Sequence, residues 1–133
     1  MVKWFVLGLV LCGGLTACAR TDGIALDGQE GAPAQLQVEN SGMARRLTLT
    51  EAQQQRQDGR LQVAIRLKSE IAYDQELQYR IDWFDASGMP VEPDSTSWQP
   101  LTLHGGEQRV IQASALLSQA TAFYFSVRDV VKD

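Results

Sequence analysis

The stretch Leu61-Gln62-Val63-Ala64-Ile65-Arg66-Leu67-Lys68 decides the fold class of this chain. Its large apolar residues stand at every second position, with small or polar residues between them. A period of two places the apolar side chains on one face of a β-strand and the others on the opposite face. We therefore predict a strand over 61–68 that is buried on one side.

The same alternation recurs on both sides of this stretch. Residues 77–83 alternate as far as Trp83, and the run breaks at Asp85-Ala86-Ser87-Gly88, which is typical of a turn. Further short alternating segments predict strands near 36–38, 47–49, 89–91, 98–103, 110 onward and 123–127. About seven short strands between Ala34 and Val131 predict an all-β fold, an immunoglobulin-like antiparallel sandwich rather than a closed barrel.

Two segments are also compatible with helix. Residues 51–57 are rich in Gln and fit an added helical turn, while residues 114–120 carry Ala and Leu at helical spacing. Both segments are too short to change the predicted fold class.

The N-terminus has the order of parts of a secretory signal. Lys3 supplies a positive charge, residues 4–11 are apolar except for Gly8, and Leu15-Thr16-Ala17-Cys18 closes the segment. The apolar run is much shorter than the ~20 residues that a membrane-spanning helix needs. We predict a signal peptide over residues 1–17.

The residues Leu15, Thr16 and Ala17 before Cys18 resemble the lipobox of bacterial lipoproteins. The resemblance implies that the Cys18 thiol carries lipid, with acyl chains such as palmitate, and becomes the mature N-terminus. Ala19 at the next position is similar to the pattern exported to the outer membrane. Because the other cysteine, Cys12, lies inside the signal, the mature domain has no disulfide. We expect a domain anchored by acyl chains, on the periplasmic face of the outer membrane.

Residues 18–33 contain three glycines and few large apolar side chains. We predict no secondary structure there, but a lipidated flexible tether with a root-mean-square span of roughly 20 Å. The β-sandwich domain is then expected to cover residues 34–133.

The most distinctive stretch is Tyr79-Arg80-Ile81-Asp82-Trp83-Phe84-Asp85-Ala86-Ser87-Gly88-Met89. Together with the lipobox and the terminal Phe123-Tyr124-Phe125, it resembles the YcfL-like family of small bacterial envelope lipoproteins of unknown function. The resemblance implies an immunoglobulin-like fold and a lipoprotein that faces the periplasm. It implies no catalytic or ligand-binding residues.

Composition excludes several classes of function. The net charge is -4 and the basic residues are scattered, so nucleic acid is a poor candidate partner. His104, the one histidine, stands beside Gly105-Gly106 in an expected surface loop, without a nucleophile to serve. One histidine and no free thiol cannot supply the usual zinc ligands, so we predict no metal and no cofactor.

Four carboxylates, Asp82, Asp85, Glu92 and Asp94, cluster in sequence and are compatible with Ca²⁺ binding or an acid/base pair. Solvated turn chemistry explains them better. Among the aromatic residues, Trp83 is expected in the core. Trp98, which lies between polar neighbours, is a candidate for an exposed binding surface.

These observations favour a protein that is not an enzyme. We expect a binding or scaffolding module that docks an envelope protein through a sheet edge or a loop. One alternative is a component of a secretion-type envelope assembly. Another is an enzyme that acts on envelope glycans through Asp82 and Asp94.

Overall fold

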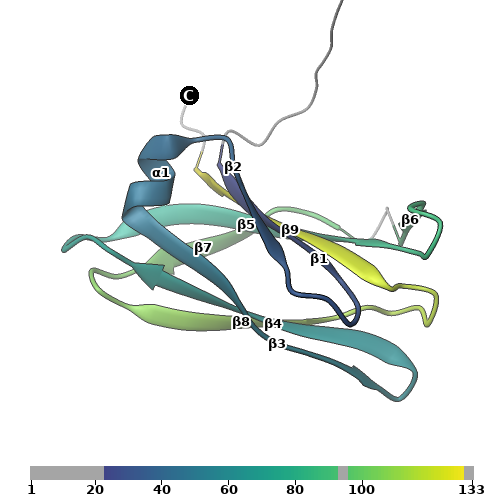
Figure 1. Ribbon diagram of the computed structural model, residues 1–133. Coiled ribbons are helices and arrows are strands. Elements are labelled where there is room, and N and C mark those ends of the chain that lie inside the picture. Colours follow the sequence, from purple (N-terminus) through teal and green to yellow (C-terminus); the bar gives the residue numbers. More distant parts are fainter. Residues whose placement is uncertain (1–22, 93–95, 131–133) are drawn as a thin grey trace, which may run out of the picture.

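The computed structural model describes residues 23–92 and 96–130. Two antiparallel sheets pack face to face as two layers (Figure 1). The larger sheet has the order β2-β1-β9-β5-β6, with β7 also paired to β5, and the smaller has the order β3-β4-β8. The strands are β1 (Ile24–Gln29), β2 (Gln35–Val38), β3 (Leu47–Gln57), β4 (Arg60–Ser69), β5 (Gln75–Phe84), β6 (Pro90–Val91), β7 (Gln99–Leu103), β8 (Gln108–Ser114) and β9 (Ala122–Asp129). The all-β sandwich is confirmed, with nine strands in the described residues where about seven were expected.

The core lies between the two sheets. Leu61 and Ile65 of β4 are fully buried, as the alternation predicted, and they face the larger sheet. That sheet contributes Phe123 and Phe125 of β9, and Trp83 of β5 with only 4% of its surface exposed. The prediction that Trp83 belongs to the core is confirmed.

The prediction of a tether without secondary structure is wrong for Ile24–Gln29. These residues form β1, which pairs with β2 on one side and with β9 on the other. The glycines that suggested flexibility mark close approaches instead, which is a common reason for glycine in a strand. A Cβ on Gly23 would collide with the Val127 carbonyl, and one on Gly28 with the Phe123 ring. The sandwich therefore begins before residue 34, and five residues separate Cys18 from Ile24.

Neither alternative helix forms. Residues 51–57 belong to β3, which pairs with β4 along its whole length and has a bulge between Glu51 and Gln53. Glutamine occupies both faces of this part of β3, so the sequence shows no alternation of apolar and polar residues there. The pairing with β4 holds the segment in an extended conformation. Residues 115–121 run from β8 to β9 as an irregular connection.

One short helix, α1 (Ser41–Arg46), was not predicted. The Asn40 side chain caps it by accepting a hydrogen bond of 3.0 Å from the Met43 amide. Met43 is fully buried, and α1 covers one end of the sandwich (Figure 1). No helix in the described part of the chain is long and apolar enough to cross a bilayer.

Candidate functional site

The outer edges of the two sheets are the first place to look for a docking site, because edge strands offer unpaired main-chain groups to other chains. The larger sheet protects both of its edges. On one side β2 has only four residues. On the other side, β6 and β7 contain Pro90 and Pro100, and proline blocks further pairing.

The outer edge of β3 in the smaller sheet is also protected. The bulge at Glu51/Gln53 interrupts its register. Farther along, the Gln54 side chain accepts a hydrogen bond of 2.9 Å from the Gly31 amide. Arg56 forms a bidentate pair with Glu30, at 2.8 Å for each contact. Side chains thus tie this edge to the turn between β1 and β2.

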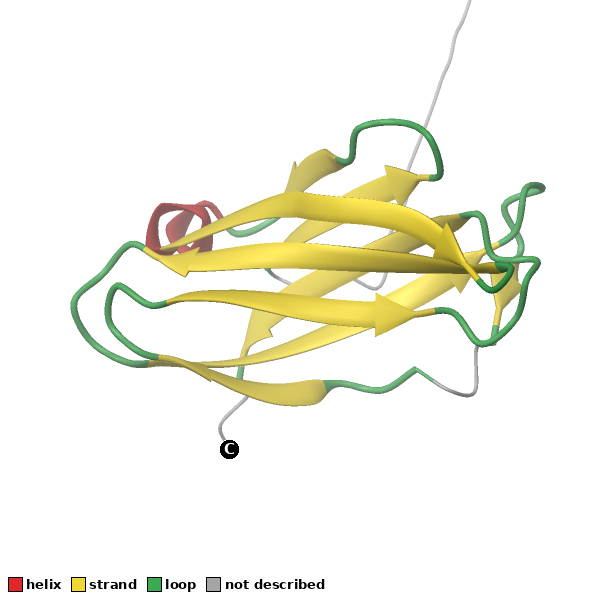
Figure 2. Cartoon of the chain, turned by 90° about the horizontal axis from the view of Figure 1, so that it is seen from below, coloured by secondary structure: helices red, strands yellow, loops and turns green. Residues whose placement is uncertain are grey.

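The outer edge of β8 has a regular register over seven residues, without proline, glycine or bulge (Figures 1 and 2). The Ala115 amide donates to the Leu61 carbonyl at 2.9 Å, and in an antiparallel pair main-chain groups point alternately to and from the partner. Hence Val110 and Gln112 direct their N–H and C=O groups away from β4. Within the described ranges no backbone partner reaches them. Arg109 points inward at the start of β8, so the uncharged part of the edge is Val110–Ser114.

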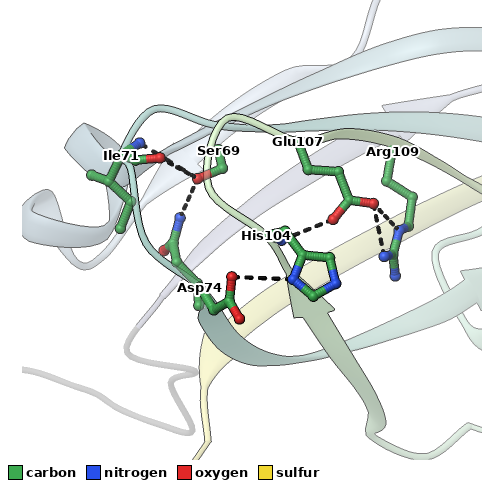
Figure 3. Close-up of polar contacts among 7 residues, drawn as sticks. Ser69, Ile71, Asp74, His104, Glu107 and Arg109 are labelled. Carbon is green, nitrogen blue, oxygen red and sulfur yellow. Dashed lines mark hydrogen bonds and ion pairs between the residues drawn. The ribbon is translucent and has the colours of Figure 1, made fainter.

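Two interlocked loops position the start of β8 (Figure 3). Glu107 accepts a hydrogen bond of 2.8 Å from the His104 amide and pairs with Arg109 at 2.8 Å. Both contacts lower the pKa of the Glu107 carboxyl, and the hydrogen bond from the His104 amide is the larger cause. Gly105 packs so closely on the Ala72 carbonyl that a Cβ would collide with it. The edge is therefore held in place before any partner binds.

Beside this edge, the open side of the sandwich contains a cleft of about 250 Å³, which we call the lateral cleft. One wall consists of inward-facing side chains of β5, and the other of the end of β8. Its lining residues are Tyr79, Arg80, Ile81, Trp83, Glu92, Thr96, Ser97, Gln99, Gln112, Ala113, Ser114 and Leu116. The Tyr79 ring stacks on Phe125, with centroids 5.6 Å apart, so the apolar wall is preformed.

The two charged side chains of the lateral cleft already have partners. The Arg80 Nε lies 3.2 Å from each carboxylate oxygen of Asp82. Glu92 accepts hydrogen bonds from the amides of Leu116 and Leu117, at 2.9 Å each. Glu92 has a positive φ of 62°, which is uncommon for a residue other than glycine. Both charged side chains of the cleft are thus already engaged in hydrogen bonds.

A shallow hollow of about 290 Å³ covers the outer face of the smaller sheet. Glutamine amides dominate its lining, and several bond to one another, such as Gln55 to Gln62 at 3.1 Å. Gln112 of β8 lines both this hollow and the lateral cleft. The edge of β8 is therefore bordered by uncharged groups on its outer face.

The structure separates the residues that the sequence marked for chemistry. His104 is exposed in a loop, as predicted, with its Nδ1 at 3.1 Å from Asp74. Asp85 is a turn residue, as predicted, and its carboxylate accepts from the Ser87 hydroxyl at 2.7 Å. The Ser87 hydroxyl is the largest cause of the lowered pKa of Asp85. Solvated turn chemistry is wrong for Glu92, which binds amides 24 and 25 positions away.

Trp98 is partly buried. The Arg128 guanidinium lies over its ring at 3.8 Å from the centroid, and that of Arg80 is 5.7 Å away. The ring therefore contacts two arginines, and a role in binding stays a prediction. The lipidation motif Leu15-Thr16-Ala17-Cys18 and Asp94 lie outside the described residues.

No group of three or more potential metal ligands occurs among residues 23–92 and 96–130. Asp82 is engaged with Arg80, Asp85 with Ser87 and Glu92 with two amides, each in a separate contact.

Sequence reasoning missed the free edge of β8 and the lateral cleft. The alternation indicated strands at 77–83 and from 110 onward, but an edge is defined by which strand has no neighbour. That property depends on sheet order, which a single sequence does not encode locally. The one available signal was the uncharged, proline-free run Val110–Ser114.

Comparison with known proteins agrees with the fold. A crystal structure of a DUF1425 family member from Shewanella sp. pv-4 is similar with a TM-score of 0.60 and 23% identity, over 87% of this chain and 97% of that one. The crystal structure of Campylobacter jejuni cj0090 is similar with a TM-score of 0.51 and 16% identity, over 65% of this chain and 88% of that one. Curated proteins gave no match. The profile of DUF1425, a family of unknown function, matches residues 34–129, and the chain belongs to this family.

Proposed function

We propose that this chain is an envelope lipoprotein that binds an extended segment of a protein partner at the free edge of β8. The observation that carries the proposal is the difference between β8 and the other three outer edges. Those edges carry prolines, a bulge or a very short strand, whereas Val110–Ser114 carries none of these. An extended segment that joins β8 obtains main-chain hydrogen bonds at Val110 and Gln112.

The anchoring part of the proposal rests on the lipobox-like residues before Cys18. Acylation there would attach the sandwich to a membrane, in our proposal the periplasmic face of the outer membrane. The finer assignment to YcfL-like lipoproteins belongs to the same proposal. Mass spectrometry of the protein from its native host tests it, with a diacylglyceryl group on Cys18 as the expected result. A Cys18→Ser variant should leave the membrane fraction, and one that stays there contradicts the anchor.

Docking at the edge is tested by photo-crosslinking in cells. A photoreactive residue is placed in turn at Gln112 and Ser114 of β8, and at Gln55 of β3 as a matched control. Gln55 is also an exposed glutamine on the same outer face, but it pairs with β4 from the protected side. We expect adducts at Gln112 and Ser114 with the same partner segment, at positions two residues apart, because a paired strand has that spacing.

The main-chain origin of the adducts is tested with Val110→Pro. Proline removes the outward N–H of Val110 and obstructs a new strand, while the ladder to β4 stays intact. We expect both β8 adducts to disappear. Adducts that persist in this variant, or that arise equally at Gln55, contradict docking at the edge of β8.

A further inference from the structure

The lateral cleft adds a side-chain requirement to the edge. We infer that it receives one bulky apolar side chain of the bound segment, at the position opposite Ala113. This inference rests on the proposed function, because the segment must first pair with β8. It concerns which segments bind, whereas the edge itself accepts any extended main chain.

Geometry places the incoming side chain. Ala113 pairs with Val63 and faces the inner side of its sheet, where it packs against the core. Side chains directly opposite each other on paired strands point to the same face. A residue opposite Ala113 on an added strand therefore points between the sheets, into the lateral cleft. Its neighbours along the segment point to the outer face, over the glutamines.

Three side chains of β5 that line the lateral cleft favour an apolar group. Tyr79, Ile81 and Trp83 provide an apolar wall, and Ala113 leaves space opposite it. The Arg80 guanidinium is paired with Asp82, and the Glu92 carboxylate accepts two amide hydrogen bonds, so both charged side chains of the cleft are already engaged. A volume of about 250 Å³ is below the range of about 300–1,000 Å³ that is usual for small-molecule sites. It suits a single side chain such as Leu, Met or Phe.

The test uses the full chain, purified from membranes in detergent, and a phage-displayed library of random peptides. We expect binders that share a bulky apolar residue at one position and polar residues beside it. Replacing that residue by Ala in a selected peptide should weaken binding about ten- to a hundred-fold, as loss of a buried side chain does. A peptide that tolerates the replacement overturns the inference.

Two variants of β8 form a matched pair. Ala113→Leu adds bulk inside the cleft, and Gln108→Leu adds a similar side chain at an exposed position of the same strand that does not line the cleft. We expect Ala113→Leu to abolish the preference for the apolar residue and Gln108→Leu to preserve it. A preference that survives Ala113→Leu in a folded protein overturns the inference, and the alanine-substituted peptide decides the question if this variant fails to fold.

The outcomes separate the two proposals. Binders without a side-chain preference that are lost in Val110→Pro support the edge and contradict the role of the cleft. Binders unaffected by Val110→Pro contradict the proposed function itself, and a library without binders counts against both.

Discussion

The strands β3 and β8 flank the same central strand β4, yet their outer edges differ. The β3 edge is bulged, and Gln54 and Arg56 tie it to the turn between β1 and β2. The β8 edge is regular, uncharged over Val110–Ser114, and lies beside the lateral cleft. An unprotected edge can pair with another chain, and this difference between the two edges is the basis of the proposed docking site.

The largest expected effect is a loss of stability at β4, the strand that pairs with both β3 and β8. Ile65 of β4 is fully buried and pairs with Glu51 of β3 on one side and Ile111 of β8 on the other. Ile65→Ala removes core volume and should cost about 2–5 kcal/mol of the free energy of unfolding. Urea denaturation measures this, with the exposed neighbour Arg66→Ala as a control of small effect. A comparable loss in both variants would show that β4 does not hold the sandwich together as described.

Proline substitutions at two neighbouring positions of β8 test which of its N–H groups point outward. Ala113 directs its N–H to β4, whereas Gln112 directs it outward. Ala113→Pro should cost about 1–3 kcal/mol, because the ladder loses a hydrogen bond and leaves a buried acceptor. Gln112→Pro should cost clearly less while it removes docking. Equal losses of unfolding free energy would mean that the outward direction of Gln112 is wrong.

On the β3 side, Arg56→Ala tests whether side chains hold the edge. The guanidinium pairs with Glu30 and also donates to the carbonyls of Gly59 and Ala120. The hydrogen bond with Arg56 is the largest cause of the lowered pKa of Glu30. We expect a lower Tm than for Arg66→Ala, and new self-association as the edge is released, measured by light scattering. A Tm equal to that of Arg66→Ala would remove this contrast between the two edges.

The smallest effect concerns pH at the start of β8. The pKa of Glu107 lies below its ordinary value of 4.5, chiefly because the His104 amide donates to it and then because of Arg109. A depressed carboxyl pKa gives stability that is present above the ordinary value and is lost as the pH falls through the folded pKa. We therefore expect Glu107→Gln to lower the Tm near neutral pH and to reduce its fall in acid. Parallel Tm curves for the two proteins would contradict this contribution.

The sequence predicted the β-sandwich and the burial of Trp83 because alternation reports which face of a strand is covered. It failed at β1, where Gly23 and Gly28 were interpreted as flexible although they allow close packing on β9. Alternation also failed to predict the strand at residues 51–57, since a polar strand that is exposed on its outer face has no regular spacing of apolar residues. The candidate site could not be predicted from the sequence for another reason. Tyr79 and Ala113 are far apart in the chain, and only the order of strands brings them to one cleft.

The early start of β1 limits how far the sandwich can move from its anchor. With Cys18 acylated, the six residue steps from Cys18 to Ile24 extend over at most about 22 Å, at 3.3–3.6 Å per residue. The domain would then stay close to the lipid headgroups instead of sampling the width of the periplasm. A partner that binds β8 as proposed would have to reach that layer, so membrane-bound proteins, or long ones that extend to the bilayer, are the appropriate class in which to search.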